Sequence, residues 1–143
     1  MDWRGKKIMI KMKGHSVSKT HPTVSGEALV VEDLIAFWAG VDWESGEIVE
    51  VAHSGRGNNI SGKILVFPSG KGGAGETFGY YYLYRNGKAP QALICNSVQA
   101  TTVAGAVICQ TPMIYGFDKD ILKVIKTGDI VEVDSKNETI KVI

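Results

Sequence analysis

Short apolar runs rich in Val, Ile and Ala recur along this chain and constrain its fold more than any other feature. Most are bounded by Gly, Pro, Asn or charged residues, which is the pattern of short strands in a strand-rich domain. The runs that predict strands are Lys7–Lys13, Ala28–Val31, Glu47–Val51, Lys63–Phe67, Gln91–Cys95 and Ala106–Gln110. At the C-terminus, IVEVD (130–134) and TIKVI (139–143) alternate apolar with polar residues around a polar connection and predict a β-hairpin.

Helical periodicity is weaker and is confined to short pieces. These pieces are Glu32–Trp38, Thr77–Arg85, Ser97–Ala104 and Asp118–Ile125. Because predicted strands outnumber predicted helices, we expect a strand-rich α+β fold. No internal repeat or Pro/Ser-rich linker divides the chain, so we expect a single domain over residues 1–143.

The charge balance excludes several classes of partner. Sixteen Lys and Arg against fifteen Asp and Glu leave a net charge of +1, which argues against a nucleic-acid or anionic-membrane partner. No stretch approaches eighteen apolar residues, and the N-terminus alternates Lys with apolar residues, so we expect a cytoplasmic protein.

The two cysteines, Cys95 and Cys109, lie in apolar runs without CxxC spacing or a nearby His. We therefore predict two buried thiols and no metal site made by this chain alone. Both lie in the span 89–117, which contains no charged residue at all. We interpret this span as the interior of the domain or as a face covered by another protein.

Glycine is the compositional excess, and its distribution points to a site. Eleven of the seventeen glycines lie between Gly40 and Gly87. Among them, the loop PSGKGGAGET (68–77) follows a predicted strand and precedes a predicted helix, an arrangement whose backbone N–H groups bind anions. The alternative is a turn that only lets the strand pack closely on the helix.

Two nucleotide-binding templates fit this loop poorly. Gly70, Gly72 and Gly75 match GxGxxG, but no acidic residue for a ribose follows about twenty positions later. Residues 70–77 also resemble the GxxxxGK[ST] phosphate loop, except that Glu76 occupies the position of the phosphate-binding lysine. We therefore expect neither a dinucleotide site nor nucleotide hydrolysis.

A second polar cluster precedes the loop. His53 is a candidate general acid or base, or a carboxylate ligand when protonated, and the alternative is a hydrogen-bonded loop histidine. Arg56 suits bidentate recognition of a carboxylate or phosphate, or is simply solvated.

Several of these segments together resemble the small, swivel-domain subunit of the aconitase X family of dehydratases. The segments that carry the resemblance are GEALV (26–30), FWAGVDWESGEIVE (37–50), His53 with Gly57 and Ile60, GKILVFPSGKG (62–72), GYYYLY with GKAPQALI (79–94) and AGAVICQTP (104–112). The resemblance implies a swivelling β/β/α barrel-like domain with short flanking helices that docks on a larger catalytic subunit. It also implies an iron or iron–sulfur centre held by that large subunit, with no cofactor bound by this chain.

The resemblance further implies a site with a specific departure from the family. Family members continue the loop with a serine that is thought to accept the catalytic proton. Here Glu76 stands at that position if residues 73–75 are an insertion, and Gly73 stands there if they are not. Glu76 is the first candidate for the base, and Thr77 or Ser69 could supply a hydroxyl instead. Alternatively, the chain is a divergent paralogue with another substrate or without activity.

These points lead to one functional hypothesis. The chain is expected to be the small subunit of a two-subunit hydro-lyase, inactive without its large subunit, that removes water from a small hydroxy-carboxylate such as 5-phosphomevalonate or cis-3-hydroxy-L-proline. The anion-binding residues are expected to be Ser69, Gly70, Lys71, Gly72 and Gly73, with His53 and Arg56 at the rim. A charged fraction of 22% is not typical of a hyperthermophile, which favours an amino- or hydroxy-acid substrate over phosphomevalonate. The competing hypothesis is a non-catalytic swivel or assembly module.

Overall fold

The structure is a computed structural model that describes residue 5 and residues 10–143. One sheet of eight strands has the order β1-β8-β7-β3-β4-β5-β6-β2. The strands are β1 (Ile10–Lys13), β2 (His15–Ser16), β3 (Val24–Val30), β4 (Ile64–Phe67), β5 (Ala92–Cys95), β6 (Met113–Tyr115), β7 (Ile130–Asp134) and β8 (Thr139–Val142); the helices are α1 (Glu76–Arg85), α2 (Ala100–Ile108) and the short 3-10 helix η1 (Ile121–Lys123). The strand-rich α+β expectation is confirmed.

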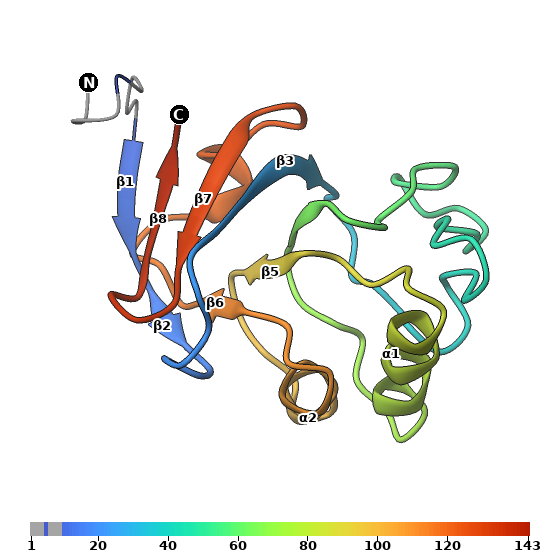
Figure 1. Cartoon of the computed structure of the whole chain (residues 1–143). Helices are drawn as coiled ribbons and strands as arrows, with labels where there is room; N and C mark the ends of the chain where they lie inside the picture. Colours follow the sequence, from blue (N-terminus) through green and yellow to red (C-terminus); the bar gives the residue numbers. More distant parts are fainter. Residues whose placement is uncertain (1–4, 6–9) are drawn as a thin grey trace.

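The sheet has a parallel and an antiparallel part that meet at β3. Strands β3, β4, β5 and β6 pair in parallel, whereas β7, β8 and β1 continue from β3 in antiparallel pairs. The helices α1 and α2 form the crossovers from β4 to β5 and from β5 to β6, and they lie side by side on one face of the parallel part (Figure 1). No helix in the described part of the chain is long and apolar enough to cross a membrane.

The sheet nearly closes into a barrel, and a single residue connects its two edge strands. Its two edge strands, β1 and β2, follow one another in the chain and are separated only by Gly14. One bent stretch therefore pairs with β8 through its first half and with β6 through its second half. A Cβ on Gly14 would lie 2.7 Å from the carbonyl oxygen of Tyr115, so this corner accommodates glycine alone without rearrangement.

Alternation along the parallel strands divides the core into two halves. Ile64 and Val66 face the barrel interior, and Leu65 and Phe67 face the helices. Because these strands are buried on both faces, they consist of continuous apolar runs instead of alternating ones. The span 89–117 supplies β5, α2 and β6, so much of it is interior as expected, whereas Val107 and Ile108 on α2 are exposed.

Several predicted elements are confirmed. Ala28–Val31 falls on β3, Lys63–Phe67 on β4, Gln91–Cys95 on β5 and Thr77–Arg85 on α1. The C-terminal hairpin is β7 and β8, paired from Val131 with Val142 to Asp134 with Thr139. Of the predicted strand Lys7–Lys13, the part 10–13 forms β1, and residues 7–9 lie outside the described residues. Both cysteines are buried, and burial raises the pKa of Cys95 to about 12.

Other predicted elements are wrong or shifted. The predicted helix Glu32–Trp38 is an irregular segment in which Ile35 forms a parallel bridge with Gly70. The predicted strand Glu47–Val51 makes only isolated bridges. The predicted strand Ala106–Gln110 is the end of α2 and the turn after it, because an apolar run of this length also suits a buried helix. The helix predicted at Ser97–Ala104 begins later, at Ala100, and that at Asp118–Ile125 shrinks to η1.

Candidate functional site

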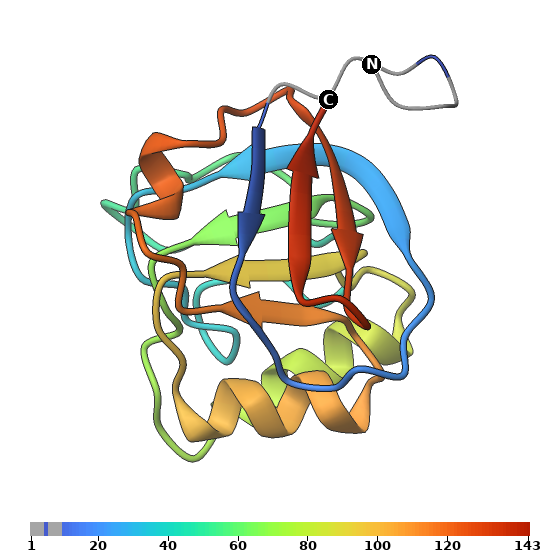
Figure 2. The same cartoon turned by 90° about the vertical axis from the view of Figure 1, so that its left-hand side faces the viewer.

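Three segments meet where the parallel strands end. The arrowheads of β4, β5 and β6 point to the same side of the molecule in Figure 2. Residues 31–38 follow β3, residues 68–75 follow β4, and residues 96–99 follow β5. Ligands of sheets with parallel strands bind outside these carboxyl ends. We call residues 68–75 the glycine loop.

The glycine loop presents unpaired backbone donors. Its first part is anchored to the preceding segment, since Ile35 donates to the Ser69 carbonyl and Lys71 donates to the Ile35 carbonyl, at 3.2 and 2.9 Å. Beyond Lys71, the N–H groups of residues 72–75 make no hydrogen bond to any described residue. Gly72 and Gly73 have φ angles of +82° and +106°, which only glycine adopts readily. These N–H groups precede the N-terminus of α1, and backbone donors at a helix start are a type of group that binds anions.

Close packing is a second reason for the glycines. A Cβ on Gly70 would lie 2.2 Å from Thr102 Oγ1, and one on Gly75 would lie 2.8 Å from the Trp38 ring. A Cβ on Gly79, in the first half of α1, would lie 2.2 Å from the Phe37 carbonyl oxygen. The loop therefore both exposes donors and lets α1 and α2 approach the sheet edge closely.

Glu76 is turned inward, toward the backbone of the segment after β3. It is only 4% exposed, and its Oε2 accepts a hydrogen bond of 2.6 Å from the Phe37 N–H. Burial raises the pKa of the Glu76 carboxyl, against the opposing effect of the Phe37 and Trp38 N–H groups. The carboxylate therefore holds residues 37–38 against the start of α1.

The two candidate hydroxyls also donate to backbone. Thr77 Oγ1 donates to the Thr101 carbonyl at 2.8 Å, which links the first turns of α1 and α2. Ser69 is 6% exposed, and its Oγ donates to the Gly70 carbonyl at 3.1 Å.

Lys71 lines a pocket of about 400 Å³ beside the glycine loop. Its Nζ forms an ion pair of 2.5 Å with Glu50 Oε1. The other lining residues are Asp33, Leu34, Val51, Ala52 and His53. Asp33 accepts a hydrogen bond of 2.8 Å from the Ser54 N–H, and this interaction lowers the pKa of its carboxyl. Sequence reasoning missed Glu50 and Asp33 because both were placed in predicted regular elements that do not form.

The structure brings His53 to this pocket but not Arg56. His53 is 7% exposed, its Nδ1 accepts from the Gly55 N–H at 2.9 Å, and its Nε2 lies 3.0 Å from the Leu34 carbonyl oxygen. Both ring nitrogens are thus engaged with backbone, as in a hydrogen-bonded loop histidine. Arg56 is exposed and does not line the pocket.

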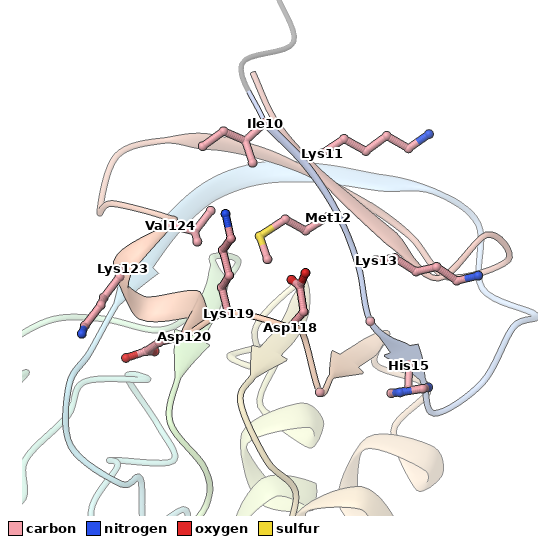
Figure 3. A pocket seen from close by; sticks show the side chains of 12 residues that line it. Ile10, Lys11, Met12, Lys13, His15, Asp118, Lys119, Asp120, Lys123 and Val124 are labelled. Atoms are coloured by element: carbon pink, nitrogen blue, oxygen red, sulfur yellow. The ribbon is translucent and has the colours of Figure 1, made fainter.

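A larger hollow of about 1140 Å³ lies between β1 and residues 116–124. Figure 3 shows Met12, Asp118 and Lys119 directed toward its interior, whereas Lys11 and Lys13 point away from it. It occupies the side of β1 that has no strand partner in the described structure. None of the residues predicted for the site lines it.

Comparison with known proteins places these features in a family. Residues 11–142 match the family model described as the aconitase X swivel domain. The chain belongs to this family. The expected swivel fold is confirmed by the crystal structure of Thermococcus kodakaraensis aconitase X in its holo form, which superposes with a TM-score of 0.86 at 34% identity and covers 94% of this chain and 98% of that one.

Two curated relatives of this aconitase X swivel domain carry the same name. The phosphomevalonate dehydratase small subunit of Methanosarcina acetivorans is 36% identical over 136 residues, which are 95% of this chain and 93% of the relative. The protein of the same name from Pyrococcus abyssi is also 36% identical, over 94% of this chain and 99% of the relative.

Proposed function

We propose that this swivel domain is the small subunit of a hydro-lyase that dehydrates a phosphorylated hydroxy acid of the phosphomevalonate type. The observation that carries the proposal is the glycine loop, whose N–H groups at residues 72–75 are unpaired beside the cation of Lys71. Phosphate and carboxylate groups both bind such donors. The names of the relatives favour phosphomevalonate over hydroxyproline, and they outweigh the argument from charged-residue content.

The proposed partner is a large subunit that carries the metal. In the described part of this chain, no three His, Cys, Asp or Glu side chains gather in a way that could hold a metal ion. The buried thiol of Cys95 is held neutral by its raised pKa, and thiols bind metals as thiolates. We propose that the large subunit holds the iron or iron–sulfur centre, and activation of the leaving hydroxyl would then come from that side.

This chain would orient the substrate anion and supply the proton acceptor. Glu76 is the only carboxylate among the three candidates, and burial raises its pKa, which makes it a stronger base than an exposed carboxylate. Its bond to Phe37 would have to loosen for the carboxylate to reach the substrate. Thr77 and Ser69 are the hydroxyl alternatives, each of which would need to give up a bond to a carbonyl.

The test is a dehydratase assay on the complex with the large subunit, comparing Glu76→Gln, Thr77→Ala and Ser69→Ala. Gln retains an oxygen that can accept from Phe37, so Glu76→Gln removes the base and preserves the hydrogen bond. If Glu76 is the base, kcat falls by about 100-fold or more in this variant with little change in KM. If all three variants turn over phosphomevalonate at the unmodified rate, the assigned roles are wrong.

The same assay separates the competing function, a non-catalytic assembly module. A complex that binds the large subunit but dehydrates neither phosphomevalonate nor cis-3-hydroxy-L-proline would support the module. Turnover of hydroxyproline alone would retain the hydro-lyase class and overturn the proposed substrate.

A further inference from the structure

The first turn of α2, a helix of nine residues, has no side-chain cap. The N–H groups of residues 98–101 make no hydrogen bond to any described residue, and the side chain at the N-cap, Gln99, makes no capping hydrogen bond. The first turn of α1 contains Glu76, whereas the first turn of α2 contains no acidic residue. The start of α2 therefore offers free backbone donors without a carboxylate among them, an arrangement that favours an anion.

A buried hydroxyl in the same turn also lacks a partner. Thr102 is only 1% exposed, and its Oγ1 makes no hydrogen bond to any described residue. Burying a hydroxyl without a partner costs free energy, so such a group normally binds a water molecule or a ligand. This oxygen is directed toward the glycine loop, because a Cβ on Gly70 would lie 2.2 Å from it. Thr101 Oγ1 is likewise buried without a hydrogen bond.

The start of α2 and the glycine loop are neighbours in space. Ser97 donates through its N–H to the carbonyl of Pro68, the first residue of the loop, at 3.2 Å. The Gln99 side chain lies against Gly72, where a Cβ would be 3.2 Å from its Oε1. The two sets of free N–H groups, one in the loop and one at the start of α2, therefore border the same end of the sheet.

We propose that the start of α2 binds the phosphate group of the substrate, while the glycine loop and Lys71 bind its carboxylate. This inference rests on the proposed function, whose substrate carries both groups. Glu76, the candidate base, directly follows the loop, and the proton to be removed lies next to the carboxylate, so that end of the substrate is assigned to the loop. The phosphate at the other end would accept hydrogen bonds from the N–H groups of residues 98–101 and from Thr102 Oγ1. Helices packed side by side have axes about 8–10 Å apart, which leaves room for a short substrate with an anion at each end.

The first test places a carboxylate at the start of α2. Ala100 is exposed, so Ala100→Glu is expected to fold, and a Glu in the first turn stabilises a helix while it repels a phosphate bound there. In the complex with the large subunit, the KM for phosphomevalonate should rise by about tenfold or more, without a lower melting temperature. The matched control is Val107→Glu, 55% exposed in the last turn of the same helix, which should keep the unmodified KM.

The second test removes the unpartnered hydroxyl. Thr102→Val keeps a side chain of similar shape, so it should raise the KM by about fivefold or more without lowering kcat or the melting temperature. Thr102→Ser retains the hydroxyl and should keep the KM near the unmodified value. A hydroxyl that only supports packing would give the opposite result for Thr102→Val, a lower melting temperature with an unchanged KM.

Inorganic phosphate probes the same site without turnover. In NMR spectra of the isotope-labelled full chain, the amide signals of residues 98–101 should shift when phosphate is added, and Ala100→Glu should abolish these shifts. A complex without dehydratase activity overturns the proposed function and, with it, the assignment of a substrate phosphate to α2. An active complex in which Ala100→Glu or Thr102→Val keeps the unmodified KM, or phosphate shifts confined to residues 72–75, overturns the inference and leaves the proposed function standing.

Discussion

At the scale of single residues, the Lys71 ammonium pairs with Glu50 in the structure. Under the proposed function, the same ammonium and the neighbouring N–H groups, which make no hydrogen bond to any described residue, would bind the substrate anion. If the pair is a resting contact, the substrate displaces Glu50, and the two residues have opposite effects on substrate binding.

We therefore predict a split between Lys71→Gln and Glu50→Gln in the reconstituted complex. Lys71→Gln should raise KM by about tenfold or more, because a charge-assisted hydrogen bond contributes roughly 1.5–3 kcal/mol. Glu50→Gln should leave KM unchanged or lower it, since it frees the ammonium. Equal increases in KM for both variants would indicate that the ion pair has a purely structural role.

A second prediction concerns the pH dependence that Glu76 contributes. Its carboxyl pKa is raised above the ordinary value of 4.5 by burial, so the folded chain holds this proton to higher pH than the unfolded chain does. The contribution of Glu76 to stability is therefore greatest below pH 4.5 and decreases as the pH rises through the raised pKa. The difference in free energy of unfolding between the unmodified chain and Glu76→Gln, measured by urea denaturation from pH 4 to 8, should fall with pH. A difference that rises would mean that the hydrogen bonds to the carboxylate outweigh burial.

The sequence alone could locate the glycine loop, but it could not predict the side-chain contacts of Lys71 and Glu76. The GKG run and its position between a strand and a helix are local signals, so the loop was predictable. The bond between Glu76 and Phe37 joins residues 39 positions apart, and it depends on segment 31–38 lying against α1. No periodicity in the sequence carries that information. The same holds for the pairing of Lys71 with Glu50.

At the scale of elements, the sequence predicts strands well where both faces of the strand are buried, because such strands need continuous apolar runs. Strands β4 and β5 are continuous apolar runs followed by Pro68 and Asn96, and both were predicted from these runs. The helix predicted within segment 31–38 does not form, because tertiary contacts determine the conformation of this segment, including the bridge between Ile35 and Gly70. The run at 106–110 fails as a strand because its apolar composition suits a helix packed on α1 equally well.

The contact of α1 with that irregular segment yields a third prediction. In an exposed helix, Gly→Ala stabilises by about 1 kcal/mol. In Gly79→Ala, the new methyl group would meet the Phe37 carbonyl at 2.2 Å, so the helix must move away from residues 37–38. We expect a loss of about 1–3 kcal/mol in the free energy of unfolding instead of a gain. A chemical denaturation curve gives the sign directly, and a stabilised variant would refute the close contact.

At the scale of the whole molecule, the closure of the barrel depends on the corner at Gly14. We predict that Gly14→Ala lowers the free energy of unfolding by about 1–3 kcal/mol, since its methyl group would collide with the carbonyl of Tyr115 and the side chain of Ile114. Thermal melting checks this, with the exposed neighbour Lys13→Ala as the control that should melt normally. Equal melting temperatures for the two variants would show that the corner adapts.

The corner at Gly14 also affects how readily the chain aggregates before assembly. A sheet with long free edges offers its unpaired N–H and C=O groups as a template for strands of other molecules, which starts aggregation. In the part of the chain that the structure describes, the two outermost strands are four and two residues long and are joined at Gly14, so these strands expose little free edge. A small subunit with exposed apolar side chains near its glycine loop is thus less prone to aggregate before it assembles with a partner.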